Sequence, residues 1–507
     1  MNKLKYTLIL LVFTTSLLGQ DLSQVDRSAS NSHEHFGWDM ALTDQWMVVG
    51  SPHSTTGAGE DAGKVLIYQK IDGQWVEFQT LIDPDGNAFY NYGFSIDMSE
   101  NQIVIGAIGS FNFGPFSGEV FVYSLDQGQW VLNQILVASD GSAGDHFGHD
   151  VAIANNRIVV GSLYGNGQAD ESGAAYVFEN VEGVWTEREK LVAADGALND
   201  NFGFSVDVSD QGKVLIGAPN HSGIHEMDGA AYLFEDGGDG YLQSAILKQN
   251  EPSRRDYFGT SVALTEDDIL VGAFLADGFS NNTGAAYFFN KVNGDWTQVQ
   301  KLANEDSELN DYFARYLTMT NDRLLIGAPK ANAESGYDVG RAYYYEISNG
   351  RWILNQVLED PDGSEHNYFG SSVALSSFGL GISARMHDGE AYDGGAVYTS
   401  TLGRVTSNES KINLERSISL INYPNPAPEE IRIQFELLGP AAVSINIFDS
   451  NAKPVKVLLS ESMLDAGKQE FIWDLRSSSG QQVANGIYLY RLTIDGNTIT
   501  RKLIVNQ

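Results

Sequence analysis

The segment DHFGHDVAIANNRIVVGS, Asp145–Ser162, decides the fold, because close variants of it recur along the chain. It begins with an aromatic–glycine pair, alternates apolar and polar residues, turns at Asn155-Asn156 and continues into the apolar run RIVVGS. Alternation with a period of two, broken by turn residues, is typical of short β-strands joined by tight turns. The segment therefore predicts two adjacent strands.

The aromatic–glycine pair returns every 55 or 56 residues, and a second aromatic marker keeps the same step. The pairs are Phe36-Gly37, Tyr92-Gly93, Phe147-Gly148, Phe202-Gly203, Phe258-Gly259, Phe313-Ala314 and Phe369-Gly370, and the second marker is Trp75, Trp130, Trp185, Tyr241, Trp296 and Trp352. So regular a period predicts an array of repeated supersecondary units.

Each unit contains four strand-like runs, which in the third unit are HDVAIA, RIVVGS, GAAYVFE and VWTEREKLV. These runs have strand composition, and no window shows a sustained period of 3.6 residues. Four strands per unit in seven units predict an all-β fold, a seven-bladed β-propeller of four-stranded blades. A solenoid is the alternative, but it would need terminal caps.

The seventh unit has three strand-like runs and then loses the pattern, so it lacks the strand that carries tryptophan. We expect the N-terminal segment Leu22–Val25 to supply that strand, which would close the ring and remove two exposed sheet edges. The predicted propeller spans residues 21–403.

The repeated residue types have physical reasons. The aromatic residue of each pair is expected to wedge between neighbouring blades, its burial contributing about 1.5–3 kcal/mol. The glycine permits close backbone approach or a positive φ. Polar residues two positions before the aromatic are expected to cap turns through their side-chain oxygens, with metal ligation as the alternative. These residues are Glu34, Asp145, Asp200, Asp256, Asp311 and Asn367.

Residues 1–20 have the layout of a secretory signal peptide: Lys3 and Lys5, the apolar run Leu8–Phe13, then small and polar residues. A buried N-terminal strand is the alternative. The run is too short to span a bilayer, and no later segment is apolar enough, so no transmembrane segment is expected in the mature chain. The chain has no cysteine, which excludes disulfides, thiol chemistry and cysteine-ligated zinc.

The negative charge is concentrated in residues 21–415, which hold 20 basic and 57 acidic residues. A field of that sign repels nucleic acids and anionic membranes, so neither is an expected partner. Solubility outside the cell explains the charge, and attraction of cations such as calcium is the alternative.

A polar segment, 404–417, is interpreted as a linker, and a different domain occupies 418–507. Its strand-like runs, separated by turn signals, predict a small β-sandwich. These runs are 430–437, 442–449, 454–459, 468–475 and 486–494.

The repeated pattern FG-SVA, VGAP and GAAYVF resembles the FG-GAP repeat, the blade unit of integrin α-subunit propellers, over residues 22–403. The segment that contains tryptophan resembles the bacterial branch of that family. Integrin-like repeats often carry a calcium loop between their first two strands. In this chain that connection is tight, as in ANN at 154–156, so calcium is not expected there.

Acidic loops before each aromatic–glycine pair are the remaining calcium candidates, because converging oxygens can hold calcium, although turn chemistry explains Asp-Gly equally well. The candidate ligands are Asp83, Asp85, Asp140, Asp195, Asp360 and Asp362.

The C-terminal residues resemble the type A sorting domain of the type IX secretion system. The resemblance rests on Tyr423, Pro424, Asn425, Pro426, Gly467, Trp473, Asp474, Gly486, Tyr488 and Lys502. It implies a Bacteroidota-type cell, Sec export, passage across the outer membrane by the secretion machinery, and removal of the domain by a sorting peptidase. The cargo would be released or attached to surface lipopolysaccharide. A carbohydrate-binding or immunoglobulin-like sandwich is the alternative.

Enzyme motifs such as G-x-S-x-G, H-E-x-x-H and the Walker loop are absent from the sequence. The connections between the second and third strands are the longest and differ most, and such loops often carry binding residues. Their aromatic residues are the candidate ligand contacts: Phe111, Phe113, Phe116, Tyr164, Phe279, Tyr337 and Tyr392. We expect a secreted or surface-displayed protein that binds a protein or a glycan, without catalysis. The alternatives are a glycan hydrolase or lyase that uses carboxylates near the channel, and a passive surface-layer component.

Overall fold

The computed structural model describes most of the chain, namely residues 22–27, 31–278, 281–304, 308–333, 335–348, 350–389, 391–402, 421–425, 427–437, 441–449, 453–464, 467–494 and 497–505. The predicted signal peptide and linker, Phe279 and Pro426 lie outside these residues. Every regular element in the described ranges is a strand, and no helix there is long and apolar enough to cross a membrane.

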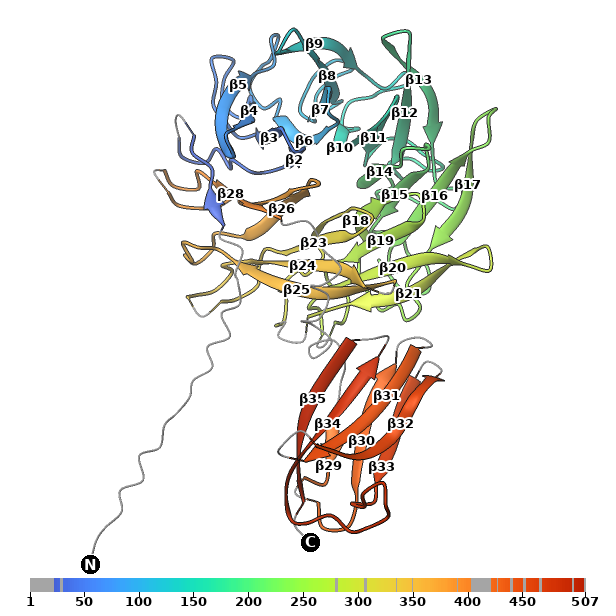
Figure 1. Cartoon of the computed structure of the whole chain (residues 1–507). Coiled ribbons are helices and arrows are strands. Elements are labelled where there is room, and N and C mark those ends of the chain that lie inside the picture. Colours follow the sequence, from blue (N-terminus) through green and yellow to red (C-terminus); the bar gives the residue numbers. More distant parts are fainter. Residues whose placement is uncertain are drawn as a thin grey trace, which may run out of the picture.

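Residues 22–402 form seven four-stranded antiparallel sheets around a ring (Figure 1). Six of them, sheets 1 to 6, each take four consecutive strands. Sheet 1 is β2 (Met40–Leu42), β3 (Trp46–Ser51), β4 (Lys64–Ile71) and β5 (Gln74–Leu81); sheet 2 is β6 (Tyr92–Met98), β7 (Gln102–Ala107), β8 (Glu119–Asp126) and β9 (Gln129–Leu136); sheet 3 is β10 (Phe147–Ala154), β11 (Arg157–Ser162), β12 (Ala174–Val181) and β13 (Val184–Leu191). Sheet 4 is β14 (Ser205–Val208), β15 (Val214–Ala218), β16 (Ala230–Asp236) and β17 (Tyr241–Leu247); sheet 5 is β18 (Phe258–Leu264), β19 (Asp268–Ala273), β20 (Ala285–Val292) and β21 (Asp295–Leu302); sheet 6 is β22 (Tyr316–Met319), β23 (Arg323–Ala328), β24 (Arg341–Ser348) and β25 (Arg351–Glu359).

Sheet 7 joins the two ends of the ring. It contains β26 (Phe369–Leu375), β27 (Gly379–Ala384), β28 (Ala396–Thr401) and the N-terminal strand β1 (Ser23–Gln24). β1 pairs antiparallel with β28, with Ser23 opposite Thr399, and the buried Val25 donates its backbone N–H to the Val397 carbonyl oxygen at 2.8 Å. The first strand of the ring therefore occupies the outer edge of its last sheet.

Apolar residues fill the space between consecutive sheets, and the aromatic residue of each repeated pair lies in one of these layers. Phe202, for example, is buried with Val177 of sheet 3 and Tyr232 of sheet 4. The next residue, Gly203, has a φ of +86°, and a Cβ on it would lie 2.2 Å from the Ala174 carbonyl oxygen. Both the positive φ and the close approach require glycine at this position.

Six residues two positions before the aromatic were predicted to cap turns, and four of them make the predicted contact. Asp145, Asp200, Asp256 and Asp311 each accept the backbone N–H of the residue three positions earlier, at 2.6–2.9 Å. Glu34 pairs with Lys64 at 2.8 Å and accepts the side-chain amide of Asn31 at 2.7 Å, while the Asn367 amide donates to Asp360 at 2.6 Å.

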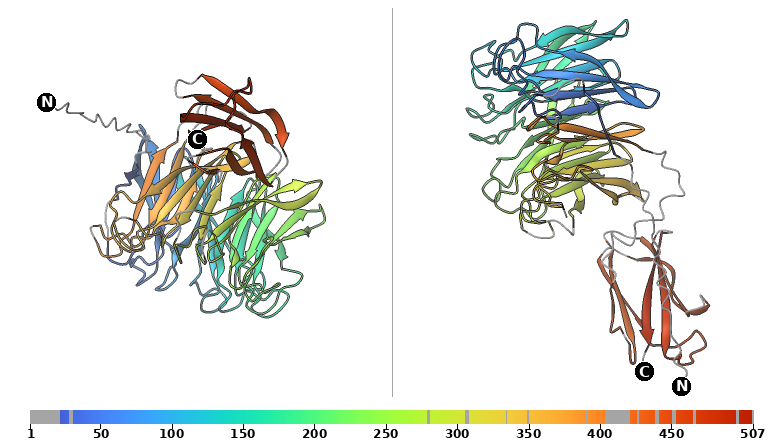
Figure 2. Two further views of the ribbon diagram at one scale, coloured as in Figure 1. Left: turned by 90° about the horizontal axis from the view of Figure 1, so that it is seen from below. Right: turned by 90° about the vertical axis from the view of Figure 1, so that its left-hand side faces the viewer.

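The ring has two unlike faces (Figure 2). The long connections between second and third strands and those leading into each first strand gather on one face, which we call the loop face. The short hairpin turns lie on the other, which we call the turn face. The turn face holds a cavity of about 730 Å³ lined in part by Asp44, Glu100, Asp210 and Asp322. Leu402, the last described residue of the ring, donates its N–H to Phe378 in a hairpin turn of this face at 2.9 Å.

Side chains also clamp neighbouring sheets at the outer edge of the ring. The Gln134 side chain in sheet 2 donates to the Trp185 carbonyl at 2.7 Å and accepts the Trp185 N–H at 2.9 Å. The same two-bond contact joins Gln79 to Trp130 and Gln300 to Trp352.

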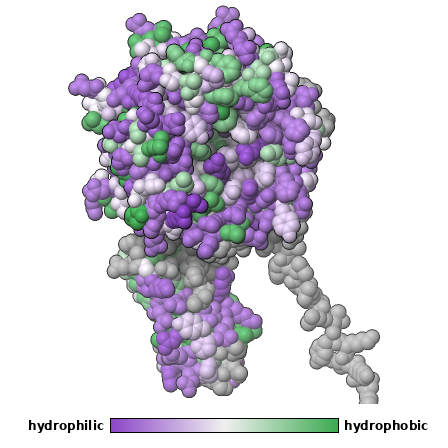
Figure 3. Space-filling model, turned by 180° about the vertical axis from the view of Figure 1, so that it is seen from behind, coloured by the Kyte–Doolittle hydropathy of each residue, from purple (hydrophilic) through white to green (hydrophobic). Residues whose placement is uncertain are grey.

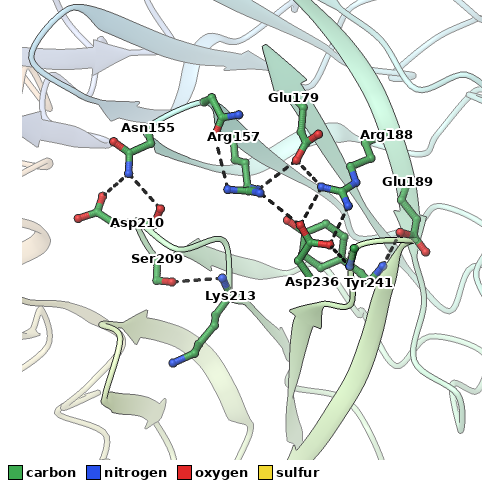
Figure 4. A network of polar contacts seen from close by, with 12 residues as sticks. Asn155, Arg157, Glu179, Arg188, Glu189, Ser209, Asp210, Lys213, Asp236 and Tyr241 are labelled. Atoms are coloured by element: carbon green, nitrogen blue, oxygen red, sulfur yellow. Dashed lines mark hydrogen bonds and ion pairs between the residues drawn. The ribbon is translucent and has the colours of Figure 1, made fainter. Parts of the chain in front are cut away.

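An ion-pair network replaces the glutamine clamp between sheets 3 and 4, where Glu189 and Tyr241 stand in place of glutamine and tryptophan (Figure 4). The Tyr241 N–H donates to Glu189 at 2.7 Å, and Arg188 reaches Asp236 at 2.7 Å and contacts Glu179. Charged pairs thus hold this seam between the two sheets.

Residues 421–505 form two further sheets, one of β29, β30 and β33 and one in the order β32, β31, β34, β35. The bounds are β29 (Ile421–Tyr423), β30 (Ile431–Leu437), β31 (Ala441–Asp449), β32 (Pro454–Leu464), β33 (Gly467–Trp473), β34 (Gly486–Ile494) and β35 (Asn497–Val505). One apolar cluster draws buried residues from both sheets, as a β-sandwich does.

The predicted sorting residues build this sandwich. Trp473 is fully buried, donates its indole N–H to Arg476 at 2.9 Å and meets Tyr488 edge-on. Asn425 bonds to the backbone of Lys502 and Ile504 on the last strand. The remaining described residues of this set are Tyr423 and Pro424 at the first strand, Gly467 and Gly486 at strand starts, and Asp474, which accepts the Arg476 N–H. Their part in sorting stays a prediction.

Candidate functional site

The structure brings three of the predicted loop aromatics together on the loop face. Phe111 packs edge-on against Phe116, with ring centroids 6.4 Å apart, and Tyr164 contacts His146 at 5.2 Å. His146 in turn lies 5.8 Å from Phe116, and Tyr90 lies 5.3 Å from Phe111. These five residues form a continuous row, which we call the aromatic patch.

The aromatic patch is open to solvent. Phe111, Phe116 and Tyr164 remain 45%, 42% and 39% exposed, and it is their contiguity that is informative, since single exposed apolar residues are common. Figure 3 looks onto the loop face, where hydrophobic side chains gather in the upper half. A cavity of about 310 Å³ beside the patch is lined by Tyr164, Asp145, Asn166 and Glu171 among others. The patch is therefore a surface with a hollow next to it.

The other predicted loop aromatics lie outside the patch. Phe113 packs over Gly141, where an added Cβ would lie 2.7 Å from its ring. Tyr392 is exposed and contacts His33, and Tyr337 is exposed. Phe279 is outside the described residues.

A second group of aromatic residues, which sequence reasoning missed, surrounds the central channel where it opens on the loop face. The ring centroids of Trp38 and Phe94 are 5.4 Å apart, those of Phe94 and His149 5.5 Å, and those of His149 and Phe204 4.7 Å. Each residue stands two positions after the aromatic of its repeat, where the last three repeats have Thr260, Arg315 and Ser371. We call these seven residues the channel mouth. That fixed position was the available signal, since side chains two positions apart along an extended chain lie at equivalent places in every repeat.

His149 in the channel mouth and His35 beside it are neutral at physiological pH. Burial lowers the pKa of His149 to about 3 and that of His35, which stacks on Trp38, to about 4. His149 Nδ1 lies 3.0 Å from the Phe204 carbonyl oxygen. The imidazoles therefore act as aromatic and hydrogen-bonding surfaces and not as cations.

Four aspartates line the channel below the mouth and tie consecutive sheets together. Asp97 accepts the N–H of Met98 at 2.8 Å and that of Ile153 in sheet 3 at 2.7 Å. Asp39, Asp150 and Asp207 make the same pair of contacts, each to its own strand and to the next sheet. Each carboxylate thus replaces a missing backbone acceptor between two innermost strands.

Burial raises the pKa of Asp39 to about 6, those of Asp97 and Asp207 to about 7, and that of Asp150 well above its ordinary value. All four side chains keep some contact with water because they line the channel, yet protein surrounds them on every side. The enclosure outweighs that contact, since a narrow channel holds too little water to solvate four carboxylates fully.

The acidic loops proposed for calcium use their carboxylates within the protein. Asp140 accepts the Tyr176 hydroxyl at 2.7 Å and pairs with Lys190 at 2.6 Å, and Asp195 accepts the Tyr232 hydroxyl at 2.8 Å. Asp362 accepts the Tyr398 hydroxyl at 2.7 Å, while Asp83 and Asp360 each accept a backbone N–H two residues on, from Asp85 and Asp362.

Within the described ranges, no three or more His, Asp or Glu side chains are grouped so that they could hold a metal ion. Calcium binding by these loops stays a prediction.

Comparisons with known proteins agree with this geometry. The family model described as FG-GAP repeat matches six times and covers more than half of the chain, at 75–123, 130–178, 185–234, 241–289, 296–345 and 352–399. Each match runs from the tryptophan strand of one sheet into the third strand of the next. Sheet 1 is preceded in the chain by β1 and not by a tryptophan strand, so no match begins upstream of Phe36. This accounts for six matches beside seven sheets.

The model described as secretion system C-terminal sorting domain matches residues 422–506. Integrin alpha-2 of Bos taurus is 26% identical over 217 residues and that of Mus musculus 28% over 225 residues, each match covering 39% of this chain and 18% of the integrin. The chain thus spans less than a fifth of the length of these relatives.

Among solved structures, Chaetomium thermophilum Sqt1 aligns with a TM-score of 0.42 and 10% identity over 70% of this chain and 82% of that one. PorZ, a bacterial surface component of the type IX secretion system of Porphyromonas gingivalis, aligns with a TM-score of 0.26 and 13% identity over 92% and 70%. The sorting domain indicates that the protein is secreted or placed on the outer-membrane surface. The chain belongs to the FG-GAP repeat family and carries a C-terminal sorting domain.

Proposed function

We propose that this protein is a secreted or surface-attached binding protein whose loop face recognises a protein or glycan ligand. The observation that carries the proposal is the aromatic patch. Contiguous exposed aromatics on a soluble protein mark interaction sites more often than scattered ones do. Aromatic side chains are also enriched in protein interfaces, and loops on a rigid scaffold are the usual place for binding residues.

The family supports this proposal by analogy. Integrin alpha subunits are members of the same repeat family, and a binding role suits a chain whose tail directs it outside the cell. The sorting domain implies an interaction with the secretion machinery. The ligand face belongs to the ring.

The test compares the wild-type protein with a triple variant, Phe111→Ser, Phe116→Ser and Tyr164→Ser, on a glycan array and a panel of surface proteins. We expect the variant to lose at least tenfold in affinity for any ligand that the wild type binds. The control replaces three exposed apolar residues of the outer edge with serine: Ile71, Val181 and Leu242. Equal losses of affinity in both variants, or full binding by the patch variant, would show that the loop face is not the binding surface.

The channel aspartates make a glycan hydrolase or lyase the second candidate, since enclosed carboxylates with raised pKa values are typical of catalytic acids. Against it stands the use of both oxygens of each carboxylate by backbone N–H groups. The test is a screen with chromogenic glycosides at pH 5–7, repeated with Asp97→Asn. Turnover that this substitution abolishes would support the enzyme.

A further inference from the structure

Two arginines, Arg315 in the channel mouth and Arg385 beside it, depart from the pattern of the repeats around them. Arg315 occupies the position two after the aromatic, where four other repeats have aromatic rings. Arg385 directly follows β27, where the corresponding residues are Pro52, Ile108, Leu163, Pro219, Phe274 and Pro329. At each of the two positions the other six repeats have no arginine, so neither arginine is needed to form a blade. The two arginines belong to sheets 6 and 7.

Aromatic rings hold the two guanidinium groups. The Arg385 guanidinium carbon lies 4.7 Å from the centre of the Trp38 ring. That of Arg315 lies 4.9 Å from Phe274 and 5.4 Å from Phe204. Arg385 also donates to the Tyr316 hydroxyl at 3.2 Å. Stacking on ring faces fixes a guanidinium in place while its N–H edge stays free to donate.

Among the described residues, the two cations have no carboxylate partner. In the parts of the ring that the structure describes, most other arginines and lysines lie within 4 Å of an Asp or Glu oxygen, whereas neither Arg315 nor Arg385 does. The Arg385 Nε is buried without a hydrogen-bond acceptor in the described part of the chain.

The pKa of the Tyr316 hydroxyl also responds to the positive charge of the two arginines. Burial raises the pKa of its hydroxyl, but Arg385 and Arg315 outweigh burial and hold that pKa below its usual value. The two guanidinium groups thus make the immediate surroundings of the Tyr316 hydroxyl positive.

An anion with a flat, two-oxygen group is the complement of such a pair, because a carboxylate accepts two parallel N–H bonds from a guanidinium. Trp38 and Phe204 carry the guanidinium groups of Arg385 and Arg315 over their rings, whereas the partly exposed Phe94 carries none. An aromatic face next to a carboxylate site suits a sugar ring, whose C–H groups pack on it. An acidic amino-acid side chain has no ring to place there.

The charge of the surrounding domain restricts the ligand further. With 57 acidic and 20 basic residues in 21–415, the domain repels a polymer that carries a charge on every unit. A neutral chain with one carboxylate at its tip avoids that repulsion and delivers its charge to the axis of the ring.

We propose that the channel mouth binds a terminal carboxylated sugar of an otherwise neutral glycan through Arg315 and Arg385. This inference rests on the proposed binding function and names a ligand class for it.

The experiment measures binding of three small probes to the wild-type protein by saturation-transfer NMR and calorimetry: methyl β-glucuronide, methyl β-glucoside and N-acetylaspartate amide. We expect the glucuronide to bind and to be weakened about tenfold or more in Arg315→Gln and in Arg385→Gln. Arg254→Gln removes the same charge from an exposed, ion-paired arginine ahead of sheet 5 and should leave binding unchanged. Thermal melts of all three variants show whether each is folded.

Binding of the glucuronide that persists in both folded arginine variants would overturn the proposal, as would equal binding of the glucoside. Equal or tighter binding of the aspartate probe would assign the site to an acidic protein segment instead. If no probe binds while the aromatic-patch variant still loses an array ligand, the inference fails and the proposed function stands. If neither experiment shows binding, both fail.

Discussion

At the scale of single residues, the repeat depends on positions where the backbone conformation requires glycine. Gly203 combines a φ of +86° with a carbonyl oxygen 2.2 Å from where a Cβ would be. Gly183, in a hairpin turn of the turn face, has a φ of +90° and no atom within 4 Å of that point. The two glycines therefore share the backbone strain that alanine would suffer, and only the first adds a clash.

We expect Gly203→Ala to destabilise the ring by about 2–4 kcal/mol and Gly183→Ala by about 1 kcal/mol, because the first adds overpacking to the strain of a positive φ. Chemical denaturation followed by tryptophan fluorescence measures both. Equal losses would mean that the neighbouring backbone moves aside.

Asp97 gives a pH-dependent prediction. Its pKa is about 7 in the folded protein and about 3.9 when unfolded, so the folded state takes up a proton that the unfolded state does not. The stability that Asp97 contributes is thus present at low pH and is lost as the pH rises through 7.

Asp97→Asn removes this titration, so its cost in unfolding free energy should be larger at pH 5 than at pH 8, by about 1–2 kcal/mol after allowing for channel water. Denaturation of both proteins at the two pH values measures the difference. Asp126→Asn, an exposed residue at the end of β8, is the control. A cost independent of pH would contradict the raised pKa.

Residue roles could be predicted where they recur at one offset and not where the offset changes. The turn caps stand two positions before the aromatic in four repeats, so the sequence indicated them. Asp39 and Asp150 lie three positions after the aromatic, whereas Asp97 and Asp207 lie five after it. Because offsets of three and five differ by one strand period, both place the side chain on the same face of the innermost strand but at different heights, so these aspartates do not align in the repeat although they make the same contacts.

At the scale of elements, the glutamine clamp shows how one blade is fastened to the next. Trp130, Trp185 and Trp352 each accept one hydrogen bond from a glutamine of the preceding sheet and donate one to it, and all three are almost fully buried. Trp296 faces Ala245 at the corresponding position and is only half-buried. The seam between sheets 4 and 5 therefore lacks the two hydrogen bonds that the glutamine clamp supplies at Trp130, Trp185 and Trp352.

We expect Gln134→Ala to lower the free energy of unfolding by about 1–3 kcal/mol, because it leaves a buried N–H and carbonyl of Trp185 without partners. Ala245→Gln should do the reverse at Trp296 and raise stability by about 0.5–1 kcal/mol. Melting curves of the two variants test the pair. A destabilising Ala245→Gln would show that the seam lacks room for the clamp.

Strand order followed from the sequence, but the channel mouth did not. Alternation and turn residues locate strands because both are local properties. Arg315 and Arg385 are 70 positions apart and meet only because sheets 6 and 7 are neighbours in a closed ring. Sequence spacing carries no information on that meeting until the ring is built.

At the scale of the whole molecule, closure depends on one short strand. Val25, which directly follows β1, is buried between sheets 7 and 1, whereas Ser23 in β1 is exposed. Val25→Asp should lower the melting temperature by several degrees, since it places a charge without a partner in an apolar layer. Ser23→Asp is the matched control and should have little effect. If both variants melt like the wild type, β1 is not what holds the ring shut.

The position of Leu402 has a further consequence for how the protein works outside the cell. The polypeptide leaves the ring from the turn face, on the side away from the aromatic patch and the two arginines. A cell that tethers the protein by its C-terminus would therefore hold it by the turn face and present the loop face to the surroundings. Cleavage of the tether would release the protein and leave the loop face unchanged.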